Sequence, residues 1–132
     1  MNPADPDTGE LLGSIHGGFS WGLLVVSDPD SSGEIPTWAS PDEPVTSTTG
    51  ALVVRVEHEQ EGPATVHVYR GIGDLASAPA FDGSITSASG ELTVGDALAG
   101  QWIRVSVALG MHRLRIVLNR PTNANHIDVA ID

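Results

Sequence analysis

The side chains of this chain that could bind a metal ion or transfer a proton are histidines and carboxylates. His67 falls on the outward side of one expected strand, and Glu57 and Glu59 fall on the outward side of the strand before it. If these two strands pair as a hairpin, the three side chains meet on one face. They could then hold a metal ion or act as a general acid and base. The more ordinary outcome is a solvated contact between opposite charges.

Complete motifs for metal binding or nucleophilic catalysis are missing from the sequence. No histidine has a second one at the strand spacing i, i+2 or the helix spacing i, i+4. Asp28, Asp30 and Ser32 match the first half of a calcium loop, but Ala39 replaces the closing glutamate, so a capped turn fits better and calcium binding stays open. The chain has neither cysteine nor a G-x-S-x-G motif. We predict no cofactor, no metal site, no catalytic residue and no enzymatic activity.

Aromatic and arginine side chains have the composition of a binding surface. Trp102 is expected on an outer face beside arginines, a combination typical of binding hot spots, while Trp38 lies in a long loop. The alternative is that loops fold over both tryptophans and bury them. The full set of predicted binding residues comprises Trp38, Trp102, Tyr69, Arg104, Arg113, Arg115, Glu57, Glu59 and Glu61.

The charge is acidic and is concentrated in the first half of the chain. The 132 residues carry 17 acidic side chains against 6 basic ones, all arginine, for a net charge of −11. Residues 1–69 contain eleven of the acids and only Arg55. This distribution excludes ordinary nucleic-acid binding through basic patches and argues against docking on anionic membranes. It can steer a basic protein partner, although it can also serve solubility alone.

The same arithmetic bounds the class of protein. A length of 132 residues predicts a single domain, in which the polar residues 1–10 can remain disordered. No apolar run approaches the length of a membrane span, and the N-terminus does not resemble a signal peptide. We expect a cytoplasmic bacterial protein, and the sequence does not determine its oligomeric state.

The elements that must position these side chains are expected to be strands throughout. In Gln101–Arg120, alternation places Ile103, Val105, Val107 and Leu109 on one face, and it resumes after Gly110 with Leu114, Ile116 and Leu118. This pattern predicts a hairpin turning at Gly110-Met111, with Arg104, Arg113 and Arg115 together on its outer face. Acids on neighbouring strands are the expected partners of these arginines, and a small-anion or acidic-peptide site is the alternative.

Further strands are expected from shorter runs of alternation or apolar residues. Ala51–Glu59 should place Leu52, Val54 and Val56 inward and Val53 outward, and Gln60–Pro63 should join it to Ala64–Arg70 as a hairpin. The remaining expected strands are Leu11–His16, Phe19–Ser27 with a bulge at Gly22, Ser84–Thr86, Glu91–Val94 and His126–Ile131. Eight or nine short strands with glycine- and proline-rich turns predict an all-β fold, an antiparallel β-sandwich.

Three segments, LVVRVEHE, VHVYRG and GMHRLRIVLNR, carry a resemblance to small bacterial β-sandwich proteins. In those proteins an apolar strand ends in a tight turn and a strand of the form G-x-H/Y-R-L/V-R-I/V-x follows, which Gly110, Arg113 and Arg115 match here. On these residues the chain resembles the ComJ family of nuclease inhibitors. The resemblance implies a β-sandwich that binds and inhibits a nuclease, with carboxylates presented where a basic enzyme expects phosphates.

Three functions follow as hypotheses. The first is an acidic protein-interaction module, an inhibitor or immunity protein of a basic partner such as a nuclease. The second is a sandwich that binds carbohydrate or a small ligand through Trp38, Trp102 and Tyr69. The third is a structural subunit that assembles through exposed edge strands.

Overall fold

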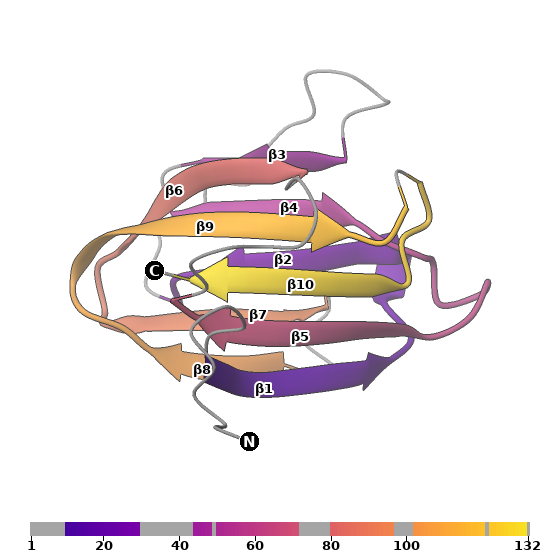
Figure 1. The fold of residues 1–132 in the computed structure, drawn as a ribbon, viewed down its shortest axis with the longest axis horizontal. Coiled ribbons are helices and arrows are strands. Elements are labelled where there is room, and N and C mark those ends of the chain that lie inside the picture. The colour runs from indigo at the N-terminus through magenta and orange to yellow at the C-terminus, as the bar shows by residue number, and fades with distance from the viewer. Residues whose placement is uncertain are drawn as a thin grey trace.

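The computed structural model is built from short strands. It describes residues 10–29, 44–48, 50–71, 80–96, 102–120 and 122–131, and within them it contains ten strands and one turn of 3-10 helix (Figure 1). In chain order these elements are β1 (Glu10–Gly17), η1 (Ser20–Gly22), β2 (Leu23–Ser27), β3 (Val45–Ser47), β4 (Ala51–Arg55), β5 (Ala64–Arg70), β6 (Phe81–Ser87), β7 (Glu91–Asp96), β8 (Trp102–Ser106), β9 (Gly110–Leu118) and β10 (His126–Ile131).

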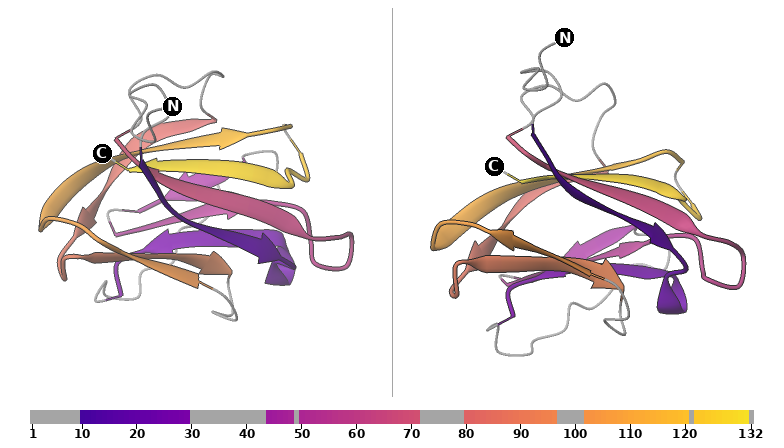
Figure 2. Two further views of the ribbon diagram at one scale, coloured as in Figure 1. Left: turned by 60° about the horizontal axis from the view of Figure 1, so that its bottom comes forward. Right: turned by 90° about the horizontal axis from the view of Figure 1, so that it is seen from below.

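The strands form two stacked sheets, so the predicted β-sandwich is confirmed (Figure 2). The first sheet has the order β1-β5-β10-β9-β6, and the second has the order β3-β4-β2-β7-β8. Neighbouring strands are antiparallel except β5 and β10, which run parallel. The first strand begins at Glu10, which pairs with Arg70. No helix in the described ranges is long and apolar enough to cross a membrane.

Alternating side chains from both sheets fill one core between them. The predicted inward positions of β4, β5 and β10 are buried as expected, and the largest fully buried side chains include Phe19, Leu24, Leu92, Leu114 and Ile116. Val53 was expected outward, yet only 7% of it is exposed. Its strand is interior, and Val53 is flanked by Thr46 on one side and Val25 on the other.

The predicted hairpin over Gln101–Arg120 is wrong. β8 and β9 lie in different sheets, and the chain crosses from one to the other between Ser106 and Gly110. Leu109, expected in the core, is 71% exposed at this crossing. A tight turn and a corner between two sheets both shift the phase of the alternation, so the sequence pattern is compatible with either.

The hairpin expected at Gln60–Pro63 is also wrong, because β4 pairs with β2 and β3 while β5 pairs with β1 and β10.

A single bent ribbon links the two sheets instead. β6 and β9 pair in the first sheet, and β7 and β8 pair in the second. Ser87 pairs with Gly110 before the bend and Glu91 pairs with Ser106 after it, so the register advances by four residues on both strands and stays unbroken. Within the bend, the Val107 amide donates to the Gly90 carbonyl at 3.0 Å. The ribbon therefore continues through the corner as one antiparallel pair.

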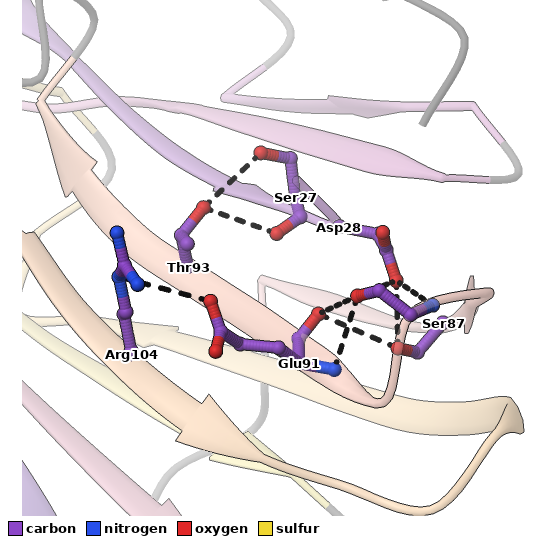
Figure 3. A network of polar contacts seen from close by, with 7 residues as sticks. Ser27, Asp28, Ser87, Glu91, Thr93 and Arg104 are labelled. Carbon is purple, nitrogen blue, oxygen red and sulfur yellow. Dashed lines mark hydrogen bonds and ion pairs between the residues drawn. The ribbon is translucent and has the colours of Figure 1, made fainter. Parts of the chain in front are cut away.

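A buried carboxylate holds this corner in place (Figure 3). Asp28, which follows β2 and is 2% exposed, accepts hydrogen bonds from the Ser87 hydroxyl at 2.7 Å and from both the amide and the hydroxyl of Ser89 at 3.1 Å. The Ser89 hydroxyl also accepts from the Glu91 amide at 3.2 Å. These bonds fix the bend against β2. They also give the first residue of the calcium-like segment a structural role, while Asp30 and Ser32 lie outside the described residues.

Replacing this carboxylate should weaken the whole sandwich. We expect Asp28→Ala to lower the free energy of unfolding by about 3 kcal/mol, because it leaves the buried Ser87 hydroxyl and the two donors of Ser89 without their charged acceptor. Glu91→Gln is the matched control. Its carboxylate lies 3.7 Å from Arg104 in a partly exposed ion pair, and its loss should cost at most about 1 kcal/mol. Urea unfolding of both variants measures the difference, and equal effects would contradict a structural role for Asp28.

Candidate functional site

The structure separates the three arginines predicted to share one patch. Arg104 lies on β8 in the second sheet, whereas Arg113 and Arg115 lie on β9 in the first. The predicted common patch is therefore wrong, because it depended on the hairpin. The guanidinium of Arg104 stacks over Trp102, 4.7 Å from the ring centroid, so one face of this exposed ring is already occupied. Trp102 and Tyr69 also lie in different sheets.

Two of these arginines meet acids on neighbouring strands, as their spacing led us to expect. Arg104 pairs with Glu91 on β7, and Arg113 forms a two-pronged contact with Asp82 on β6. In this contact Nε and Nη2 of Arg113 donate to the two carboxylate oxygens of Asp82 at 2.8 and 2.6 Å. The hydrogen bonds from Arg113 hold the pKa of Asp82 below its usual value. These side chains stabilise sheet surfaces and leave little charge for an anion.

The expected meeting of His67 with Glu57 and Glu59 does not occur. The two strands that should have brought them together belong to different sheets. Glu57 is instead mostly buried, with 16% of its side chain exposed, and its carboxylate lies 3.5 Å from Arg120. Its amide donates to the Ala124 carbonyl at 2.9 Å. Glu57 therefore ties the chain after β4 to the connection between β9 and β10.

The remaining two acids of this stretch are exposed at one end of the sandwich. Glu59 and Glu61 lie in the turn between β4 and β5, and neither has an ion-pair partner in the described part of the chain. The turn packs against the segment of η1 (Figure 2). The Glu59 amide donates to the Phe19 carbonyl at 3.1 Å, and a Cβ placed on Gly18 would lie 2.9 Å from the Cβ of Glu59.

An exposed tryptophan accompanies these acids. Trp21, in η1, is 64% exposed and adopts a left-handed backbone conformation with φ 61° and ψ 9°. Such a conformation costs a residue with a Cβ about 1–2 kcal/mol. The hydrogen bond from the Val56 amide to the Gly22 carbonyl, at 2.9 Å, anchors the turn next to it. We call Trp21, Glu59 and Glu61 the acidic end.

Sequence reasoning included Glu59 and Glu61 among the binding residues but not Trp21. The available signal was Trp21-Gly22 inside an apolar strand, where the glycine was interpreted as a bulge. It marks a 3-10 turn instead, and the regular strand begins only at Leu23. Trp38, a further predicted binding residue, lies outside the described residues.

A second group of polar side chains lies on the outer face of the first sheet. His67 and Tyr69 project from β5, and His126 and Asp128 project from the neighbouring β10, where Asp128 is paired in register with His67. The Asp128 Oδ1 atom lies 3.3 Å from Nε2 of His126 and 3.9 Å from Nδ1 of His67. The two imidazole rings meet edge to face, with centroids 5.0 Å apart. We call His67, His126 and Asp128 the histidine–aspartate cluster.

Tyr69 lies next to this cluster, and the cluster affects the pKa of its hydroxyl. Its hydroxyl lies 3.3 Å from Nδ1 of His67. Burial raises the pKa of the Tyr69 hydroxyl above its ordinary value of 10.0, and the negative charge of Asp128 raises it further. The cluster was not predicted, although both pairs, His67 with Tyr69 and His126 with Asp128, have the i, i+2 spacing that puts two side chains on one face of a strand.

Comparison with known proteins finds a similar fold but does not assign the chain to a family. No family model matches the chain, and no curated protein sequence matches it. A solved structure does match: ComJ from Bacillus subtilis, described as an inhibitor of the DNA-degrading activity of NucA. The chain has the fold of ComJ. The alignment covers 92% of this chain and 96% of that one, with a TM-score of 0.67 and 9% sequence identity. A weaker match covers 89% of this chain and 94% of a protein titled crocagin biosynthetic gene J, at 14% identity and a TM-score of 0.49.

The pKa of the tyrosine tests the geometry of the cluster directly. The chain contains a single tyrosine, so phenolate absorbance in a pH titration reports Tyr69 alone. We expect Asp128→Asn to lower this pKa while leaving it above 10.0, because the charge is removed and the burial remains. Asp82→Asn, three strands away in the same sheet, should leave it unchanged, since solvent and salt screen exposed charges at that distance. An unchanged or higher pKa in Asp128→Asn would contradict the contact.

Proposed function

We propose that this chain is a protein-interaction module that binds a basic protein and acts as its inhibitor or immunity protein, a nuclease being the preferred target. Two independent features support the proposal. The chain shares its fold with an inhibitor of a DNA-degrading enzyme, and it carries a net charge of −11. An enzyme that binds phosphates presents a basic cleft, and a strongly acidic protein can offer carboxylates to that cleft.

The observation that carries the proposal is the acidic end. Trp21 is a large apolar side chain held outward on a strained backbone, and exposed tryptophans are frequent anchors of binding hot spots. Glu59 and Glu61 lie on the turn that hydrogen-bonds to this segment and have no ion-pair partner among the described residues, so their charge is available to a cationic surface. Backbone hydrogen bonds between the two segments keep the anchor and the charges together. The end of the sandwich thus combines an apolar anchor with unpaired negative charge.

Each part of this surface has a separate role in binding. Exposed carboxylates act mainly on the rate of encounter with a basic partner, and salt screens their contribution. The tryptophan contributes after contact, when its ring is removed from water against the partner. The complex should therefore form quickly at low salt and be held by a contact that depends less on salt.

The alternative functions receive less support from the structure. A carbohydrate site would need Trp102 and Tyr69 on one surface, but they lie in different sheets and Arg104 covers one face of the Trp102 ring. Assembly through edges would use β1 or β6 of the first sheet, or β3 or β8 of the second. We find no further observation on the described residues that favours either function.

The test begins with the immobilised chain and a lysate of its native host at low salt. We expect a basic protein to be captured and to elute as salt rises. Titration of that purified protein should show that Trp21→Ala weakens binding by about 2 kcal/mol, the size of a hot-spot residue. Glu59→Gln combined with Glu61→Gln should slow association and flatten its dependence on salt. If the captured protein is a nuclease, the chain should reduce DNA cleavage.

The control is an acid on another surface. Asp82 is already paired with Arg113, so Asp82→Asn should leave the captured partner's affinity unchanged. Binding that ignores salt would contradict the proposal. So would binding weakened equally by Asp82→Asn and by changes at the acidic end, because nonspecific attraction to any acidic surface would then explain the capture.

A further inference from the structure

We propose that His67, His126 and Asp128 bind a divalent transition-metal ion, with zinc as the ion that fits them best. This site lies on the outer face of the first sheet, not at the acidic end, and it does not depend on the proposed function. The sequence analysis predicted no metal site, because no two histidines have a local ligand spacing. The three ligands come instead from two strands that are distant in the chain and adjacent in the fold.

The spacing of the donor atoms fits one small ion. One donor atom from each residue lies within 4.8 Å of the others. Zinc binds imidazole nitrogens and carboxylate oxygens at about 2.0–2.2 Å, so two ligand atoms of a tetrahedral site lie about 3.3 Å apart. His126 Nε2 and Asp128 Oδ1 already have that separation at 3.3 Å. His67 Nδ1, at 3.9 Å from the same oxygen, would need to approach by less than 1 Å.

A second observation points to a missing cation. The Oδ1 atom of Asp128 is shielded from solvent and accepts no hydrogen bond in the described structure, although two imidazole nitrogens face it. Buried polar atoms are almost always satisfied, and one that is not calls for an explanation such as an ion. A metal ion between the carboxylate and the two imidazoles would satisfy this oxygen.

The fold holds the ligands in place from below. β5 and β10 are interior strands, and the residues that alternate with the ligands, Val66, Ile127 and Val129, are fully buried in the core. Sites on strands packed in this way are positioned more precisely than sites on loops. The Tyr69 hydroxyl contacts His67 Nδ1 at 3.3 Å, and a zinc ion bound to this nitrogen would replace that contact.

The ligand types select the kind of ion. Two imidazoles and one carboxylate suit zinc and neighbouring first-row metals, whereas calcium and magnesium prefer oxygen ligands alone. Three protein ligands leave a fourth tetrahedral position for water or for a side chain of another molecule. The competing explanation is a direct contact of the His126 ring with Asp128 that needs no metal.

Calorimetric titration of the chelator-treated full chain with zinc chloride tests the site. We expect one zinc ion per chain. His126→Ala and Asp128→Ala should each weaken binding by more than about 100-fold, because loss of an outer partner of a metal ligand already costs about 10–100-fold. Tyr69→Phe should not weaken binding, because the Tyr69 hydroxyl contacts the same His67 Nδ1 atom that the zinc ion would occupy. His16→Ala is the matched control. His16 lies on β1, on the same face of the first sheet as the cluster, and its Nδ1 atom is hydrogen-bonded to the Thr65 hydroxyl at 2.7 Å.

A measurement on the unmodified chain protects the test against variants that fail to fold. Zinc should shift the ring resonances of His67 and His126 in the NMR spectrum and leave those of His16 and His58 unchanged. Cobalt in the same site should give the visible absorption of a four-coordinate ion. Absence of zinc binding, or zinc binding that leaves the rings of His67 and His126 unaffected, would overturn the proposal and favour the direct contact of His126 with Asp128.

Discussion

The architecture depends on one ribbon that belongs to both sheets. β6 and β9 enter the bend paired, β7 and β8 leave it paired, and the register does not change. Ser87, at the start of the bend, is only 1% exposed, so its hydroxyl would be costly to leave without a hydrogen bond. The Asp28 carboxylate meets this cost with one buried acceptor that serves Ser87 and Ser89 together. Because Asp28 follows β2, the corner is also anchored to the middle of the second sheet.

Ion pairs neutralise some of the acidic side chains on the surface and leave others unpaired. Three arginines neutralise acids nearby: Arg104 with Glu91, Arg113 with Asp82 and Arg120 with Glu57. Each of these pairs lies along a sheet or ties two connections together. Glu59 and Glu61 have no such partner in the described ranges, and they share their end of the sandwich with Trp21. At this end of the sandwich, two acidic side chains without an ion-pair partner therefore occur together with an exposed apolar side chain.

Alternation in the sequence predicted the strands and their buried faces, but not their neighbours. The inward sides of β5, β9 and β10 follow from period-two patterns that any half-buried strand obeys. Pairing depends on long-range contacts, and a corner at Gly110 gives the same phase shift as a turn. The patch around Arg104 and the meeting of Glu57 with His67 were wrong for this reason. β3 was missed because its three residues, Val45–Ser47, are too few to show a period.

The candidate sites show the same division between local and long-range information. The pairs His67 with Tyr69 and His126 with Asp128 can be found in the sequence, each on one face of its strand. Their convergence requires β10 to insert in parallel beside β5, and nothing within either segment specifies that. Trp21 is a local feature, but Phe19 and Gly22 on either side of it accept hydrogen bonds from the distant segment after β4.

A strained tryptophan and an unsatisfied carboxylate oxygen are exceptions in a molecule whose other described side chains mostly suit their surroundings. Most inner positions are apolar and fully buried, three arginines are paired with acids, and the buried Asp28 is hydrogen-bonded. Departures from consistency of this kind concentrate at sites that bind something. At 9% identity the likeness to ComJ carries the arrangement of strands and no individual residue. Trp21 and Asp128 are observed in this chain itself, so they are better guides to what it binds than the shared fold.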